Sequence, residues 1–315
     1  TLWNRNMIKK TLYFGHPARL SLSEGQLVIE RPGAEKVRRA TEVWFPEDKV
    51  TRPIEDIGVM ILDNPQLTLT SQLMEALLEN NCALITCDGR HLPVGLLLPL
   101  YGNTTQNERF RQQIDASVPL RKQLWQQTIR AKILNQAAVL REVGVETGCL
   151  EAWAREVRSG DPDNLEARAA AYYWKWVFRP RQGFVRDREG DYPNALLNYG
   201  YAILRAVIAR SLVASGLLPT LGIHHHNRYN AYCLADDVME PYRPFVDKVV
   251  AGMALHDEGH ELTPDVKRQL LSIPTLDVVL DGRRSPLMVA AGLTASSLNK
   301  CFSGELRHVL YPEWP

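Results

Sequence analysis

Short apolar runs separated by turn residues fill the first hundred residues and predict a β-rich region. The predicted strands are residues 11–14, 20–22, 26–29, 57–62, 82–87 and 94–98. Glu24-Gly25, between the second and third runs, predicts a hairpin. Within residues 70–80, Leu73, Leu77 and Leu78 share one helical face, so this stretch predicts an amphipathic helix.

Beyond a turn at residues 101–105 the pattern becomes helical. Long helices are predicted around residues 124–134, over 165–178 and over 195–215, the last apolar nearly all round and therefore a buried central helix. Asn164 is expected to cap the helix that starts at Leu165, which places Glu166 in its first turn. The predicted fold is α+β, with a small β-rich domain over residues 7–100 and a larger all-α domain over 101–315. The residues before Met7 are left out of this prediction.

Composition excludes several classes of protein. A hydrophobic content of 45% suits a globular chain with a sizeable core. The five cysteines are an odd number without a CxxC pair, which favours a reduced, intracellular protein. No apolar run in the sequence reaches membrane-spanning length, so we expect no membrane association and a cytoplasmic location.

The net charge of +1 does not indicate a general polyanion binder, but the charge is unevenly distributed. Residues 168–188 contain six basic side chains and a single acidic one, Asp187, interleaved with aromatic rings. This pattern fits either a solvated helix face or a surface that follows DNA phosphates. The candidate DNA-binding residues are Arg168, Lys175, Arg179 and Arg181. A second basic run contains Arg121, Lys122, Arg130 and Lys132.

A dense group of metal-ligand side chains lies between residues 222 and 241. Three consecutive histidines, His224 to His226, precede Asp236, Asp237 and Glu240. Spacings of three and four place Glu240 near both aspartates on one helical face, although Pro241 can bend that helix. Adjacent loop residues cannot all point the same way, so at most one or two histidines can bind one ion. A metal site and a solvated acidic turn both fit this pattern.

The segment His256-Asp257-Glu258-Gly259-His260 offers a different chemistry. It differs from the zinc-protease helix because Asp257 stands where the catalytic glutamate is required, and Gly259 weakens a helix there. A phosphohydrolase that uses His256 and Asp257 as a dyad remains an alternative.

Six segments in order resemble one known family. They are residues 11–21, 88–99, 131–136, 161–170, 198–201 and 222–244, and the last one ends in Met239-Glu240-Pro241-Tyr242-Arg243-Pro244. Together they resemble the CRISPR-associated integrase of the adaptation complex, in the type II subtype that accompanies a single large RNA-guided effector. The resemblance implies an N-terminal β domain, a helical catalytic domain and a divalent metal, Mg²⁺ or Mn²⁺.

The resemblance also implies specific roles. The metal ligands and catalytic residues would be Glu166, His225 and Glu240, with His224 as the alternative to His225 and Asp237 as a supporting carboxylate. The implied activity is metal-dependent DNA cleavage and the joining of spacer-precursor 3′-hydroxyls to repeat DNA. The implied partners are double-stranded DNA, a second copy of the chain, and a small ferredoxin-like subunit. A DNA-binding scaffold without catalysis is a second alternative, beside the phosphohydrolase.

Overall fold

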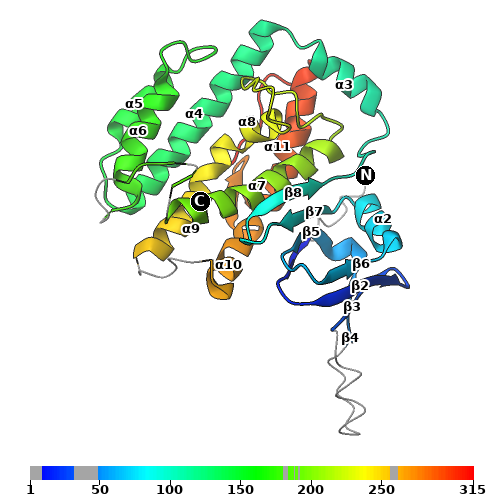
Figure 1. Ribbon diagram of the computed structural model, residues 1–315. Helices are drawn as coiled ribbons and strands as arrows, with labels where there is room; N and C mark the ends of the chain where they lie inside the picture. Colours follow the sequence, from blue (N-terminus) through cyan, green and yellow to red (C-terminus); the bar gives the residue numbers. More distant parts are fainter. Residues whose placement is uncertain (1–8, 32–48, 180–183, 188, 191, 256–261) are drawn as a thin grey trace, which may run out of the picture. The chain divides into compact units, whose positions relative to one another are not determined.

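A computed structural model describes residues 9–31, 49–179, 184–187, 189–190, 192–255 and 262–315. The chain forms two compact units, Thr1–Leu100 and Tyr101–Pro315, and each is described by itself. The first unit contains β1 (Lys10–Phe14), β2 (Ala18–Ser23), β3 (Gln26–Glu30), β4 (Lys49–Pro53), the 3-10 helix η2 (Ile54–Asp56), β5 (Ile57–Leu62), β6 (Leu67–Leu69), α2 (Ser71–Glu79), β7 (Ala83–Cys87) and β8 (Pro93–Leu97) (Figure 1).

These strands form two four-stranded sheets. One has the order β1-β5-β7-β8, in which β1, β5 and β7 are parallel and β8 is antiparallel. The other has the order β4-β3-β2-β6. The predicted hairpin is confirmed, because β2 and β3 pair antiparallel and the turn residues Glu24 and Gly25 have φ of 49° and 71°. Positive φ at both positions is the conformation that tight hairpins need.

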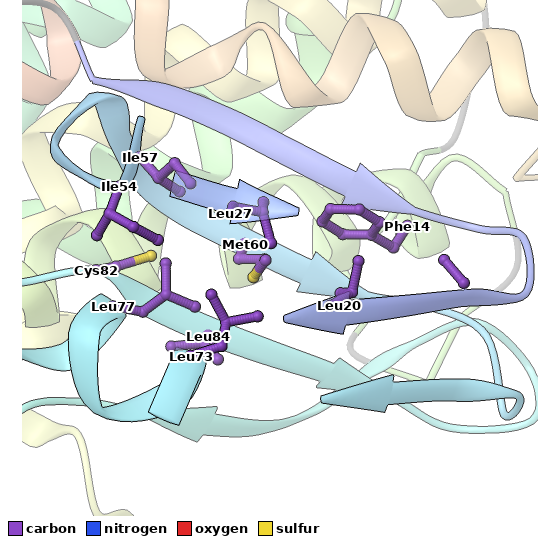
Figure 2. Packing of buried hydrophobic residues seen from close by; sticks show 11 residues of the cluster. Phe14, Leu20, Leu27, Ile54, Ile57, Met60, Leu73, Leu77, Cys82 and Leu84 are labelled. Carbon is purple, nitrogen blue, oxygen red and sulfur yellow. The ribbon is translucent and has the colours of Figure 1, made fainter. Parts of the chain in front are cut away.

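The core of the first unit lies where both sheets and α2 bring apolar side chains together. Leu20 and Leu27 come from one sheet, Met60 comes from the other, and Leu73 and Leu77 come from α2; all five are fully buried. Figure 2 shows the two α2 leucines pointing toward the strand side chains. The predicted helix over residues 70–80 is confirmed, and Thr70 caps it by accepting a hydrogen bond from the backbone N–H of Leu73.

The second unit is mostly helical. It contains α3 (Gln106–Ile114), α4 (Val118–Glu142), α5 (Gly148–Glu156), α6 (Leu165–Val177), α7 (Asn194–Ala214), α8 (Cys233–Met239), η3 (Glu240–Tyr242), α9 (Arg243–Leu255), α10 (Pro264–Leu271), η4 (Ile273–Thr275), β9 (Asp277–Leu280), β10 (Arg283–Pro286) and α11 (Leu287–Phe302). Helix α4 contacts α5, α6, α8, η3 and α9, whereas α7 contacts α8 to α11. These two long helices therefore organise the unit.

The sequence predicted a buried central helix and an all-α unit, and only the first prediction is confirmed. The buried central helix is α7. Among the described residues it is the one helix long and apolar enough to cross a membrane, but 78% of its most apolar stretch is buried inside the protein. The expectation of an all-α unit is wrong, because β9 and β10 form an antiparallel hairpin. The sequence offered a signal, because the turn dipeptide Asp281-Gly282 follows an apolar run over residues 278–280. These two turn residues adopt φ of 51° and 72°.

Leu77→Ala tests the core of the first unit. Leu77 is fully buried, so its truncation should lower the free energy of unfolding by about 2–5 kcal/mol, measured by urea denaturation. Leu97→Ala is the matched control, because Leu97 is 43% exposed and should change stability much less. Equal losses in the two variants would contradict this description of the core.

Candidate metal and DNA site

Glu166 lies in the first turn of α6, as predicted, but its helix is capped differently. Asn164 is in the N-cap position with φ of 52°, and its side chain makes no capping hydrogen bond. Asp161 does the capping instead: its two carboxylate oxygens accept hydrogen bonds of 3.0 Å from the backbone N–H groups of Leu165 and Glu166. The negative charge of Asp161 also stabilises the N-terminus of α6, which carries a partial positive charge. The helix start that carries Glu166 is therefore firmly held.

Asp237 organises the loop that carries the histidines. Its fully buried carboxylate accepts hydrogen bonds from the backbone N–H groups of Ile223 at 2.6 Å and His224 at 2.9 Å. The same carboxylate is hydrogen-bonded to Nδ1 of His225. Gly222 is required for this turn, since a Cβ there would lie 2.3 Å from the carbonyl oxygen of His225. One buried carboxylate thus fixes both the loop backbone and one imidazole ring.

His224 and His225 have different environments. The ring of His224 stacks on Trp125, with centroids 4.2 Å apart, and burial lowers the pKa of His224 below its usual value. The hydrogen bond to Asp237 raises the pKa of His225 and engages Nδ1, which leaves Nε2 as the ring nitrogen for a ligand. This arrangement favours His225 as the ligand, and that choice remains a prediction.

Glu240 begins η3, the short 3-10 segment between α8 and α9. The three nearby carboxylates, Asp236, Asp237 and Glu240, have different partners. Asp236 pairs with Arg205 at 2.7 Å, while Glu240 Oε1 lies 3.0 Å from Arg243 Nε. Burial raises the pKa of Glu240, but Arg243 and Lys132 outweigh it and hold the pKa below its usual value. Glu240 is therefore a buried, ionised carboxylate.

Lys132 connects two of the predicted ligands. Its Nζ lies 2.7 Å from Glu166 Oε1 and 2.6 Å from Glu240 Oε2. Lys132 belongs to α4, and its side chain is buried. The sequence prediction placed Lys132 in a basic run and missed this role. The spacing could have indicated this burial. Residue 132 shares a helical face with residues 125, 128, 129 and 133, all of which are buried.

Asn135, one turn further along α4, supports the same region. Its side-chain amide donates hydrogen bonds of 2.8 Å to the carbonyl oxygens of Pro241 and Pro312. Its side-chain oxygen accepts a 3.1 Å hydrogen bond from the backbone N–H of Trp314. Asn135 thereby joins α4, the turn that carries Glu240 and the segment around residue 312.

The donor types around Lys132 fit a hard divalent cation: two carboxylates, with an imidazole near enough for both to affect its pKa. Among the described residues, the close polar neighbour of the buried Glu240 Oε2 is the Lys132 ammonium, at 2.6 Å. In the part of the chain that the structure describes, no three His, Cys, Asp or Glu side chains are grouped tightly enough to hold one ion as they stand. A metal at this position requires Lys132 to move.

A cavity of about 340 Å³ opens beside His225. Its lining includes Arg121, His226 and Arg228 together with Asn227 and Asn230, and it includes no aspartate or glutamate. The lining also includes the apolar side chains of Ile114, Leu221 and Phe302, so its formal charge comes from the two arginines.

Three of the predicted DNA-binding residues lie on α6, the helix that carries Glu166, or just beyond its end. Arg168 lies over the ring of Trp153 at 4.6 Å, and both Lys175 and Arg179 lie 4.9 Å from the Trp176 ring. All three basic residues are exposed. The fourth, Arg181, and the alternative dyad His256-Asp257 lie outside the described residues.

A second buried network adjoins Arg243. The guanidinium of Arg243 lies 4.8 Å from the Tyr201 ring, and the Tyr201 hydroxyl is hydrogen-bonded to Asp247. Tyr173 donates a second hydrogen bond of 3.1 Å to Asp247. Burial raises the pKa of Asp247 to about 7 despite these hydrogen bonds.

Comparison with known proteins matches residues 12–263 to the family described as CRISPR associated protein Cas1. The chain belongs to the Cas1 family. The CRISPR-associated endonuclease Cas1 of Neisseria meningitidis serogroup C is 37% identical to the chain over 296 residues, which cover 92% of this chain and 91% of that protein. The predicted family resemblance is therefore confirmed.

Two solved structures share the fold of this Cas1 chain. A casposase bound to integration product has a TM-score of 0.74 at 18% identity, covering 95% of this chain and 92% of that one. A chain of a Cas6-RT-Cas1–Cas2 complex has a TM-score of 0.69 at 16% identity, covering 98% of this chain and 36% of that one. At such identities the likeness concerns the fold, and it confirms the α+β arrangement in outline.

The raised pKa of Asp247 predicts a pH dependence. An unfolded aspartate titrates near 3.9, so between about pH 4 and pH 7 the folded protein keeps a proton that the unfolded chain has lost. The contribution of Asp247 to stability should therefore fall as pH rises through this window and then level off.

Asp247→Asn removes this titration. The stability of the variant relative to wild type should rise by more than about 1 kcal/mol from pH 4 to pH 7, measured by urea denaturation at several pH values. Asp265→Asn is the control, because Asp265 is 77% exposed and its curve should run parallel to wild type. A constant difference between Asp247→Asn and wild type would contradict the raised pKa.

Proposed function

We propose that this Cas1-family chain is a metal-dependent DNA integrase and endonuclease of CRISPR adaptation, of the type II subtype. The single observation that carries the proposal is the meeting of Glu166 and Glu240 at one cationic group, with His225 close by. These residues come from α6, η3 and the 222–226 loop, which are far apart in sequence. Membership of the Cas1 family supports a catalytic role for these acidic and imidazole groups.

The proposed reaction is phosphoryl transfer, in which a 3′-hydroxyl of a spacer precursor, or water, attacks a DNA phosphate. A bound Mg²⁺ or Mn²⁺ would polarise the scissile phosphate and make the attacking hydroxyl more acidic. Glu166, His225 and Glu240 would hold that ion, and Asp237 would fix the ring and tautomer of His225. A related structure, a casposase bound to integration product, supports joining chemistry on this fold.

The DNA would lie across the second unit. The acid-free cavity beside His225 offers Arg121 and Arg228 to a phosphate near the reacting group. Arg168 and Lys175 extend positive charge along the exposed side of α6, the helix that carries Glu166, and Arg179 follows just beyond its end. Contacts of this kind position a DNA backbone without reading its sequence.

The proposed partners are double-stranded DNA, a second copy of the chain and a small ferredoxin-like subunit. A Cas6-RT-Cas1–Cas2 complex among the related structures supports the small subunit. The first unit is the proposed dimerisation domain, because β8 is an edge strand that exposes Val94 and Leu97. Two active sites held apart by such an assembly could join both ends of one spacer.

Glu166→Gln and Glu240→Gln test catalysis. Each removes an anionic oxygen of the proposed site with little change of shape, so half-site integration should fall by about 100-fold or more in each variant. The assay uses a short duplex with free 3′-hydroxyls and a repeat-containing plasmid, with Mg²⁺ or Mn²⁺. Glu305→Gln, at an exposed glutamate that is not part of the proposed site, is the control. Full activity in either site variant would rule out this mechanism, and DNA binding without joining by the wild-type protein would favour a scaffold.

The basic surface is tested by salt dependence. The triple variant Arg168→Ala, Lys175→Ala, Arg179→Ala should reduce the slope of log affinity against log salt by roughly two to three for duplex DNA. The control is Arg283→Ala, Arg284→Ala, Lys300→Ala, which removes the same exposed charge near β10 and α11. Equal slopes in the two triple variants would show that charge loss alone, and not this surface, weakens binding.

A further inference from the structure

Lys132 occupies the position between the two proposed carboxylate ligands. Its ammonium group lies within 2.7 Å of an oxygen of each, and among the described residues no other cationic side chain forms an ion pair with Glu166. Lysine carries its charge on a flexible four-carbon stem, so the head group can leave while the helix stays in place. Lys132 is therefore both the present counter-ion of the site and a group able to withdraw from it.

The charges around Glu240 balance without a metal. Lys132 and Arg243 carry two positive charges, and Glu166 and Glu240 carry two negative charges. Without Lys132, two carboxylates on separate elements, α6 and η3, would face each other with Arg243 against one of them only. A buried charge without a partner costs folding free energy, so Lys132 stabilises the arrangement in which α6 and η3 bring Glu166 and Glu240 together.

A divalent cation needs the same oxygens that Lys132 contacts. Adding two positive charges beside a buried ammonium would cost electrostatic free energy in a region of low dielectric. The ion and the ammonium therefore exclude each other at this position, which agrees with the lack of a ready three-ligand group in the described chain.

We propose that Lys132 is an internal cation that holds Glu166 and Glu240 together and competes with the divalent metal for them, so that metal binding displaces its ammonium group. This inference rests on the proposed metal-dependent function. It assigns Lys132 a positioning role: the lysine keeps the carboxylates assembled and sets how much metal is needed to load the site.

Lys132→Met is the direct test, using the full chain at pH 8 and Mn²⁺ as the probe. The variant should unfold at a lower temperature than wild type in EDTA, because the carboxylates lose their shared counter-ion. It should also bind Mn²⁺ at least about tenfold more tightly by calorimetry, because nothing competes for the oxygens. A larger Mn²⁺-induced rise in unfolding temperature should accompany the tighter binding.

Two further variants separate charge from structure. Lys132→Arg keeps the cation and should keep an Mn²⁺ affinity equal to or weaker than that of wild type. Lys122→Met removes an exposed lysine from the same helix and should change neither the unfolding temperature in EDTA nor the affinity. An equal or weaker Mn²⁺ affinity in folded Lys132→Met would overturn the inference while leaving the proposed function intact. Absence of Mn²⁺ binding in wild type would overturn the metal-dependent function and this inference with it.

A measurement on the wild-type protein covers the case in which Lys132→Met does not fold. The ¹⁵N resonance of the Lys132 ammonium, assigned by its loss in Lys132→Arg, should be protected from solvent exchange without metal. Addition of Mg²⁺ should shift this resonance and remove the protection. An unchanged Lys132 resonance at saturating Mg²⁺ would overturn the proposal.

Discussion

Buried negative charge is the constraint on which the second unit depends. Asp237, Glu240 and Asp247 are each buried, and each is satisfied differently. Asp237 is held by backbone N–H groups and an imidazole, and Glu240 by two cations. Asp247 is held by two tyrosine hydroxyls and is partly protonated near neutral pH. Isolated carboxylates at these positions would be strongly destabilising, so the surrounding helices are arranged to supply partners.

Helix α4 contacts each of the segments that carry the proposed ligands. Along one buried face it presents Trp125 to the stacked ring of His224, Lys132 to two carboxylates, and Asn135 to the backbone of η3. Together with Asp237 in the loop and Asp161 at the helix start, α4 therefore positions the loop, the turn and the helix that carry the proposed ligands. A long helix suits that task, because its side chains keep a regular spacing over several turns.

The sequence predicted those features that depend on local patterns. Alternating apolar runs and Glu24-Gly25 predicted the hairpin, helical spacing predicted α2, and an apolar composition all round predicted the buried α7. Asp161 was missed as the cap of α6, because Asn164 is the better-placed residue by spacing and only its backbone conformation shows otherwise. The β9–β10 hairpin was missed, although the dipeptide Asp281-Gly282 is typical of a hairpin turn.

The candidate site was predictable only in part. Glu166, His225 and Glu240 came from family resemblance, since no local pattern joins residues so far apart. Lys132 was missed because a lysine in a basic run is usually solvated, and its burial follows from tertiary contacts with α6 and η3. The separate partners of Asp236 and Glu240 likewise depend on tertiary contacts, with Arg205 of α7 and with Lys132 of α4.

The most direct test of this account is the position of Mn²⁺ by anomalous diffraction from crystals soaked in the metal. The account predicts one peak about 2 Å from oxygens of both Glu166 and Glu240 and from Nε2 of His225, in the position where the Lys132 ammonium now lies. A peak bound by His224 instead, or one that leaves the contacts of Lys132 with both glutamates intact, would contradict it.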